Sequence, residues 1–342
     1  MYYFVGSIFS FSNSKIFKFV PMSVLIFIDH IDGHAKKASL EALSYGAKIA
    51  EQTGDVAEGI VLGSPIEDLA ALGQYGIKKI HHVQNDALTN FDAQTYTKVI
   101  AQAAQQIGAK LIVFSNNSSG KSIAPRVAVR LKAGLVSGAV ALPDTSNGFI
   151  VKKNVFSGKA FAHVAVKTDV KVITLNVNSF TISSGEGKAD VVPFTATVEA
   201  SKIKVVSSSK TSGTVLLTEA DVVVSAGRGL KGPENWGMVE ELAEALGAAL
   251  ACSRPVADAH WRPHNEHVGQ TGVAIAPNLY IAIGISGAIQ HLAGVNRSKV
   301  IVVINKDADA PFFKAADYGI VGDAFEIVPK LTQAVKKLKG IA

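Results

Sequence analysis

Residues 227–232, with the sequence Gly-Arg-Gly-Leu-Lys-Gly, match the pattern G-x-G-x-x-G. An apolar run at 221–226 predicts a strand before them, and a helical pattern begins at Glu234. Strand, glycines and helix in this order are typical of a turn that binds a pyrophosphate through backbone N–H groups and a helix N-terminus. Arg228 adds a cation to the turn, and Cys252-Ser253-Arg254 stands where an acidic ribose-binding residue would end the next strand. The segment favours a nucleotide-binding turn over a simple tight turn, and argues against ordinary NAD binding.

Further polar segments follow predicted strands in the same half of the chain. Open α/β sheets bind ligands at the carboxyl ends of their strands, and a serine such as Ser286 there can cap a helix or contact a phosphate. His291 lies on the helix that follows, where a histidine is more often structural. Together these segments predict one extended nucleotide groove. They are Ser253-Arg254-Pro255, Gly269-Gln270-Thr271-Gly272, Gly284-Ile285-Ser286-Gly287 and Asn305-Lys306-Asp307, with Asp323 as the predicted N-cap of the last helix.

Three other patterns resemble known sites but lack a required residue. Ser119-Gly120-Lys121-Ser122 resembles the end of a Walker A phosphate loop, which would need glycine at Ser115. The histidines between 260 and 267 do not form H-E-x-x-H, so no metal site is predicted. Cys252 precedes Ser253-Arg254 but has no evident base, and we interpret it as a buried residue at a strand end. The sequence therefore predicts no catalytic residue.

The first half of the chain alternates apolar runs with helical patterns, which is typical of βαβ units in a parallel sheet. The predicted strands are 23–29, 55–62, 77–83 and 110–115, and the predicted helices are 36–52, 65–73, 92–107 and 119–131. From about 134 the sequence becomes rich in strand-forming residues, punctuated by Gly, Asn and Asp. We expect these stretches to be antiparallel strands appended to the sheet.

A second α/β series follows a candidate linker, residues 202–216, in which Ser, Lys, Thr and Gly cluster without helical periodicity. The expected fold class is therefore α/β, with two doubly wound parallel-sheet domains, the first carrying the appended antiparallel stretch. We expect the domains to span 22–210 and 211–342. The second series comprises strands 220–225, 248–252, 279–284, 299–304 and 318–321, and helices 234–247, 286–294 and 324–339.

Composition limits the class of protein. Of 342 residues, 48% are hydrophobic and 18% charged, which excludes a disordered chain and provides for two cores. The net charge is +6, but the lysines are scattered, and their one small cluster, at 336–339, complements the dipole of the last helix. We therefore expect no nucleic-acid function. The single cysteine excludes an internal disulfide framework and fits a reducing compartment, so we expect a cytoplasmic protein.

Residues 1–21 differ from the rest of the chain. They are rich in aromatic residues, nearly free of acids, and lack the basic start and cleavage site of a signal peptide. Met22 is followed by the pattern of a buried strand, and we expect it to be the natural start, with 1–21 a non-native or disordered extension. No apolar run reaches the length of a membrane-spanning helix, so we do not expect the chain to span a membrane.

The second half resembles the C-terminal FAD-binding domain of the electron transfer flavoprotein alpha subunit. The resemblance runs over about 225–330, through the motifs AGRGLKGPENW, ACSRPVADAHW, EHVGQTGVAIAPNLYIAIGISGAIQHLAGV and INKDADAPFFKAADYGIVGDAFEIVP. The first half is similar to the family more loosely, through VLIFIDH and PRVAVRL, and residues 1–21 have no counterpart. The resemblance implies a C-terminal domain that binds FAD, and an N-terminal domain that contacts a beta subunit.

The resemblance also implies roles for single residues. Near the flavin ring it places Arg254 beside the isoalloxazine, Gln270 and Thr271 at the edge near N5 and O4, and His291 near O2. A guanidinium and an imidazole there would provide positive potential, which favours adding an electron to the ring. The other implied FAD-binding residues are Arg228, Ser253, Val268 and Gly269, then Ser286, Gly287, Ala288, Ile289 and Gln290 near the pyrophosphate and ribityl chain, and Asn305, Asp323 and Ala324 near the adenosine; at Ala324 many family members have a larger apolar residue.

The implied function is that of an electron carrier. As the alpha subunit of a heterodimer, the chain would take electrons from acyl-CoA and related dehydrogenases and pass them singly to a quinone oxidoreductase at the membrane. Two alternatives remain open at this point: an NAD-dependent enzyme with a similar C-terminal domain, and a nucleotide-sensing module in residues 22–200. The sequence also leaves open whether the beta subunit carries a second FAD for electron bifurcation.

Overall fold

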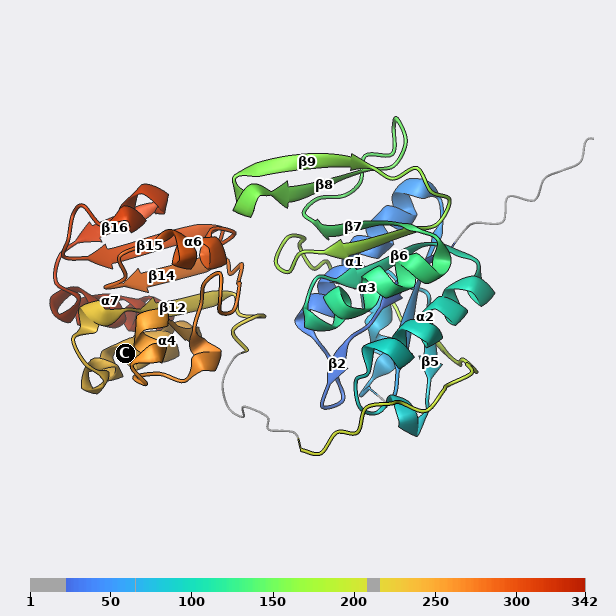
Figure 1. Ribbon diagram of the computed structural model, residues 1–342, viewed down its shortest axis with the longest axis horizontal. Coiled ribbons are helices and arrows are strands. Elements are labelled where there is room, and N and C mark those ends of the chain that lie inside the picture. Colours follow the sequence, from blue (N-terminus) through green and yellow to red (C-terminus); the bar gives the residue numbers. More distant parts are fainter. Residues whose placement is uncertain (1–22, 65, 208–215, 342) are drawn as a thin grey trace, which may run out of the picture.

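The computed structural model describes residues 23–64, 66–207 and 216–341, which form two α/β units, each built on its own sheet (Figure 1). The predicted extension 1–21 and the predicted boundary at 210/211 lie outside the described residues. Residues 202–207 of the predicted linker belong to no helix or strand. The fold class expected from the sequence, two parallel-sheet α/β domains, is confirmed.

In the first domain, the sheet has the order β11-β5-β4-β1-β6-β10-β7-β8-β9. Its strands are β1 (Ser23–Phe27), β4 (Val56–Leu62), β5 (Lys79–Val83), β6 (Ala109–Ser115), β7 (Gly134–Ala139), β8 (Ile150–Val155), β9 (Ala160–Ala165), β10 (Lys171–Leu175) and β11 (Asp190–Pro193). The helices are α1 (Lys37–Thr53), α2 (Ala93–Ile107) and α3 (Ser118–Leu131), with 3₁₀ turns at Leu69–Tyr75, Asp86–Leu88 and Phe156–Gly158 and a small hairpin of β2 (His30–Ile31) and β3 (His34–Ala35).

Two expectations for this domain need correction. The segment predicted as a helix over 65–73 is a 3₁₀ helix at Leu69–Tyr75, followed by Gly76 in the left-handed region. Of the stretches expected to be antiparallel, β8 and β9 form an antiparallel hairpin, and β8 also pairs antiparallel with β7 through Lys153 and Ala139. Strand β10 is inserted between β6 and β7 and is parallel to both, and β11 joins the opposite edge in parallel with β5. Local strand signals do not encode this order, because the partners are far apart in sequence.

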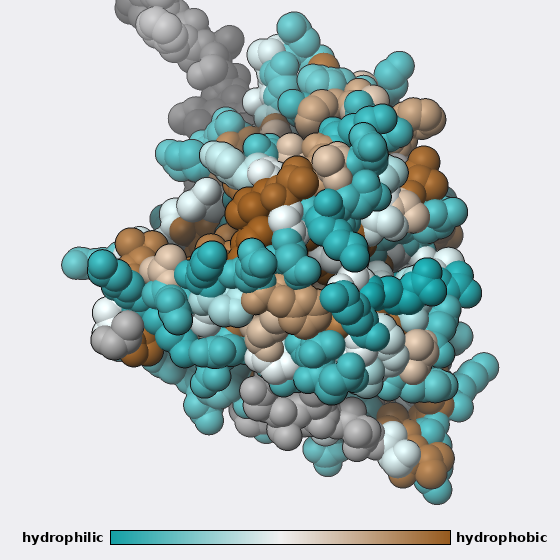
Figure 2. Space-filling model, turned by 90° about the vertical axis from the view of Figure 1, so that its left-hand side faces the viewer, coloured by the Kyte–Doolittle hydropathy of each residue, from teal (hydrophilic) through white to brown (hydrophobic). Residues whose placement is uncertain are grey.

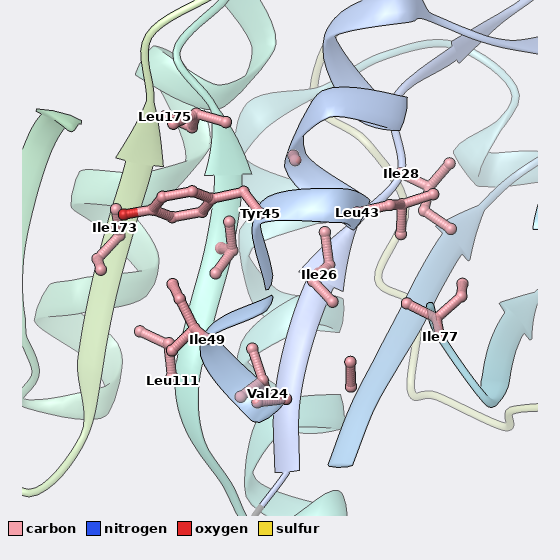
Figure 3. Packing of buried hydrophobic residues seen from close by; sticks show 14 of the residues in the cluster. Val24, Ile26, Ile28, Leu43, Tyr45, Ile49, Ile77, Leu111, Ile173 and Leu175 are labelled. Carbon is pink, nitrogen blue, oxygen red and sulfur yellow. The ribbon is translucent and has the colours of Figure 1, made fainter. Parts of the chain in front are cut away.

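Helices cover both faces of the central strands. Strands that are buried on both faces consist of continuous apolar runs, as these do. On one face, α1 packs Leu43, Tyr45 and Ile49 against the strands, as Figure 3 shows. The Tyr45 ring lies across β6 toward Ile173, and its hydroxyl donates to the Ala141 carbonyl at 3.0 Å. The opposite face is covered by α2 and α3 over a second apolar cluster.

In the second domain, the sheet is parallel throughout, with the order β13-β12-β14-β15-β16. The strand order reverses beside β12, which pairs with β13 on one side and β14 on the other. Ligands bind at such a switch point, beyond the carboxyl ends of the strands. The elements are β12 (Val222–Ala226), α4 (Gly237–Leu246), β13 (Ala249–Cys252), α5 (Arg254–Asp258), β14 (Leu279–Ile283), α6 (Ile289–Val295), β15 (Val300–Asn305), β16 (Tyr318–Val321) and α7 (Ala324–Lys339), with 3₁₀ turns at Arg228–Leu230, Pro233–Asn235, His264–Glu266 and Pro311–Ala315.

The loop that follows β10 in the first domain makes hydrogen bonds to both domains. Glu41, almost fully buried on α1, accepts from the backbone N–H groups of Asn178 and Phe180 at 2.9 and 2.6 Å. The Asn178 side chain donates in turn to the Ala276 carbonyl of the second domain at 2.9 Å. Burial raises the pKa of Glu41, although the backbone donors oppose this shift. The loop after β10 therefore holds a defined position against both domains.

On the surface that Figure 2 shows, hydrophilic residues surround separate apolar patches. None of the helices in the described ranges has both the length and the apolar composition needed to cross a bilayer.

Gly120→Ala is expected to lower the free energy of unfolding by about 2 kcal/mol, within the range for overpacking a tight site. Gly120 lies in the first turn of α3, and a Cβ atom there would overlap the Ser115 carbonyl oxygen. Urea unfolding followed by circular dichroism measures the effect. Gly237→Ala is the matched control, because a Cβ at Gly237 meets no atom within 4 Å and we expect no loss there. Equal stability of the two variants would contradict the close packing.

Candidate functional site

A cavity of about 520 Å³ lies at the carboxyl ends of the strands of the second domain. It brings together five segments that the sequence singled out separately, so the predicted single groove is present. Arg254 and His291, from opposite sides of the sheet's switch point, line the same cavity. The predicted site residues that line it are Arg228, Ser253, Arg254, Val268, Gly269, Gln270, Thr271, Ser286, Ala288, Gln290, His291 and Asn305.

Four predicted residues do not line this cavity. Gly287 is buried against Phe312, and Ile289 is 67% exposed at the start of α6. Asp323 is the N-cap of α7, as predicted, and accepts from the Phe325 N–H at 2.9 Å. Ala324 packs in the apolar core beneath α7. Their assigned contacts with a cofactor remain predictions.

One polar lining residue, His267, was not predicted as part of the groove. It directly precedes the Val268–Thr271 segment and appeared in the sequence only as part of a rejected metal pattern. Its position beside a predicted segment was the signal that could have identified it. Asp307, from the predicted segment Asn305-Lys306-Asp307, also lines the cavity. Among the described residues, no group of three or more His, Cys, Asp or Glu side chains is arranged to hold a metal ion. Cys252 is buried, and burial raises the pKa of its thiol to about 12, which fits the structural role predicted for it.

The glycine-rich segment 227–232 does not offer its amides to a ligand as expected. Five of its six N–H groups are bonded within the protein: Gly227 and Gly229 donate to the carbonyls of Ile283 and Gly284, at 2.9 and 3.1 Å, and the rest close tight turns. A Cβ at Gly229 would lie 2.6 Å from the Gly284 Cα. The glycines therefore allow two loops to pack closely, and α4 begins only at Gly237, after two 3₁₀ turns. The segment contributes Arg228 and Gly229 to the cavity instead.

Open amides occur instead in the loop 285–288, after β14. Four successive residues, Ile285 to Ala288, donate their N–H groups to no acceptor in the described ranges of the chain. Gly287 has φ +84°, and a Cβ there would lie 2.5 Å from the Phe312 backbone, so this residue holds the loop in its curved path. Adjacent free amides in a curved loop suit the oxygens of a phosphate. Ser286 is not the N-cap of α6 as considered from the sequence, because the helix begins at Ile289 after Ala288.

His291 is held from behind by a buried tyrosine. The Tyr280 hydroxyl lies 2.7 Å from His291 Nε2, and both side chains are buried. Burial raises the pKa of Tyr280, which therefore keeps its proton. Because a buried hydroxyl requires an acceptor, we assign its proton to the bond with Nε2, which leaves the imidazole proton on Nδ1. Nδ1 is buried and makes no well-formed hydrogen bond with a described residue, although the Val268 backbone is close enough to favour its proton.

The positive potential expected from His291 does not come from a charged imidazole in the chain without FAD. Burial, and then the neighbouring His267, lower the pKa of His291 to about 4, although the Val268 backbone opposes this shift. The imidazole is therefore neutral at pH 7, and it contributes a hydrogen-bond donor rather than a positive charge. The cations at the cavity are Arg228 and Arg254, and Arg254 Nε lies 3.3 Å from Asp258 Oδ2.

Acidification is expected to destabilise the FAD-free chain through His291. The unfolded chain takes up this proton near pH 6.5, whereas the folded chain does so only near pH 4. The free energy of unfolding therefore falls as the pH drops from 6.5 to 4, by at most about 3 kcal/mol from this residue. Urea unfolding of the wild type and of His291→Gln isolates the contribution, because other titrating groups are shared. Parallel pH profiles for the two proteins would contradict the low pKa.

Comparisons with known proteins agree with this geometry. Residues 24–200 match the model of the electron transfer flavoprotein domain, and residues 216–296 match that of the electron transfer flavoprotein FAD-binding domain. The second match identifies FAD as the cofactor and decides against the NAD alternative. It spans the segments from Arg228 to His291.

Relatives with the same description match along most of the chain. The electron transfer flavoprotein subunit alpha of Bacillus subtilis is 38% identical, over 90% of this chain and 95% of that protein. Those of Thermoanaerobacterium thermosaccharolyticum and Syntrophomonas wolfei are each 36% identical, over 92% and 91% of this chain and 98% of each relative. The chain therefore belongs to the electron transfer flavoprotein alpha subunit family.

Proposed function

We propose that this chain is the electron-carrying subunit of an alpha–beta heterodimer, with FAD in the cavity of its second domain. It accepts electrons from acyl-CoA and related dehydrogenases and passes them singly to a quinone oxidoreductase at the membrane. The observation that carries the proposal is that Ser253, Arg254, His291 and the unbonded amides of Ile285, Ser286 and Ala288 line one cavity at the switch point of the sheet.

The residues present fit the two chemically distinct parts of FAD. The open amides of 285–288 are donors for pyrophosphate oxygens. The orphaned Nδ1–H of His291 is a donor for a carbonyl oxygen of the ring, and the Arg254 guanidinium adds positive potential at the cavity. Asn305 is held in place by donating to the Ile285 carbonyl at 3.1 Å. When bound, FAD supplies the redox chemistry, and the protein supplies position and electric field.

Exposed apolar side chains at the edges of both sheets support a partner that contacts both domains. On the β8–β9 hairpin, Phe156 and Phe161 are 79% and 57% exposed. On the edge strand β16, Tyr318 and Val321 are 66% and 59% exposed. Exposed edges with apolar side chains are uncommon unless a partner covers them. We propose that the beta subunit does so, and that the complex is cytoplasmic, because the lone cysteine fits a reducing compartment.

Purification of the chain together with its beta subunit tests the proposal. We expect a yellow heterodimer whose flavin absorbance is bleached by an acyl-CoA and catalytic amounts of an acyl-CoA dehydrogenase. A colourless heterodimer that does not take up added FAD would overturn the cofactor assignment. A yellow heterodimer that accepts electrons only from NADH would overturn the proposed donors.

A further inference from the structure

A second cavity, of about 220 Å³, lies between the two domains and shares no lining residue with the flavin cavity. The first domain contributes the ends of β6, β7 and β10 and the β8–β9 hairpin, and the second contributes the end of α6 and the residues after it. The hairpin extends beyond the rest of its sheet (Figure 1), and a Cβ at Gly158 in its turn would lie 3.4 Å from Asn296. None of the lining residues is Asp or Glu.

The charge at this cavity is positive and unbalanced. Arg297 lines it, is half-buried, and makes no hydrogen bond or ion pair with any residue in the described ranges. Burial lowers the pKa of Arg297, as expected for a cation without a counter-ion. Lys153 also lines the cavity, and Lys121 lies near enough that its pKa is lowered by desolvation and then by the charge of Arg297. Partly buried cations normally have an anionic partner.

Neutral amide groups complete the lining and are held in place. Asn116 and Asn176 follow β6 and β10, and Asn116 Nδ2 donates to Asn176 Oδ1 at 2.6 Å. Asn116 Oδ1 accepts from the Thr174 hydroxyl at 2.9 Å, and Asn176 Nδ2 donates to the Gly138 carbonyl at 3.3 Å. The carboxyl ends of parallel strands are where open α/β sheets bind ligands. This edge of the first sheet therefore presents a preorganised polar surface to the unpaired cation of the second domain.

We propose that the cavity between the domains is a phosphate-binding site, in which Arg297 and Lys153 hold a phosphate group against the Asn116–Asn176 pair. A planar guanidinium suits phosphate oxygens, which it contacts with two parallel N–H groups. Asn154 Oδ1, buried and without a partner among the described residues, is an acceptor for the O–H of a hydrogenphosphate. Sulfate carries no such proton, so the site favours phosphate over sulfate.

Calorimetric titration of the FAD-loaded heterodimer with inorganic phosphate, at constant ionic strength, tests the proposal. FAD occupies the cavity of the second domain, whose unbonded amides would otherwise also bind phosphate. We expect one phosphate per alpha chain, with weaker binding of sulfate, and binding at least tenfold weaker in Arg297→Gln. Arg130→Gln is the matched control, because Arg130 is exposed at the far end of α3 and does not line the cavity. We expect it to bind phosphate like the wild type.

A second variant keeps the test decisive if Arg297→Gln proves unstable. Asn176→Asp retains the acceptor for Asn116 and adds a negative charge that repels a phosphate, so we expect binding to disappear. Both variants should keep a full complement of FAD. Absence of saturable phosphate binding to the wild type, or equal weakening in Arg130→Gln, would overturn the proposal. Titration with glycerol 2-phosphate then distinguishes the source: tighter binding than inorganic phosphate indicates a phosphate monoester, and weaker binding indicates free phosphate.

Discussion

Ser286→Trp is expected to abolish FAD retention while leaving the fold intact. Ser286 lines the flavin cavity but is exposed in the chain, so a larger side chain there extends into the cavity rather than into the core. The loop cannot shift to make room, because the Ser286 carbonyl accepts from the Phe312 N–H at 3.1 Å and Gly287 packs against the Phe312 backbone. An indole at 286 therefore occupies the space in front of the open amides of 285–288.

The measurement is the affinity for FAD, obtained by fluorescence titration of the purified heterodimer. We expect a loss of at least about a hundredfold, which corresponds to about 3 kcal/mol. Ser286→Ala should bind FAD nearly as well as the wild type, because the phosphate donors proposed here belong to the backbone. Lys330→Trp places the same bulk on an exposed position of α7 and should also retain FAD. Normal flavin content in Ser286→Trp would contradict the placement of the pyrophosphate.

The sequence predicted most elements because their signals are local. Apolar runs such as 23–29 and the periodic helix 92–107 mark buried strands and amphipathic helices wherever they fall. The order of the strands was predictable only in part. Strand β10 pairs with β6 and β7, and β11 crosses to the far edge beside β5. These pairings depend on which apolar faces meet in the folded sheet, which no local pattern specifies.

The candidate site was predictable to the extent that it lies at strand ends. Polar residues after β13, β14 and β15 must meet at one edge of a parallel sheet, and they line one cavity. Two expectations about the site depended on tertiary packing and are not met in the chain alone. The Gly227 and Gly229 amides of the glycine segment donate to the Ile283 and Gly284 carbonyls, and His291 is neutral in the chain alone because it is buried. The unpaired Arg297 was not predicted, because the residues that surround it come from both domains, and the sequence does not show that they include no Asp or Glu.

The neutrality of His291 leaves the arginines as the cations that tune the bound flavin. Arg254 is 63% exposed in the chain alone and pairs with Asp258, which is 54% exposed. Its effect on the ring therefore depends on how far the assembled heterodimer excludes water from the cavity. A unit charge about 4 Å away contributes about 4 kcal/mol at an effective dielectric constant of 20, and about 1 kcal/mol in bulk water. For a one-electron couple, these limits correspond to about 170 and about 40 mV.

Arg254→Ala is accordingly expected to lower the one-electron midpoint potential of the bound flavin by about 40 to 170 mV, with FAD content unchanged. The potential falls because removing a cation makes each added electron less favourable, and FAD stays because the open amides of 285–288 hold the dinucleotide. Redox titration of the heterodimer measures the shift in potential. Asp258→Asn is the matched control, and we expect it to raise the potential, because it removes a negative charge beside Arg254. A shift near 170 mV indicates a cavity closed to water by the beta subunit, and one near 40 mV indicates an open one. Unchanged potentials in Arg254→Ala would show that this guanidinium does not act on the ring.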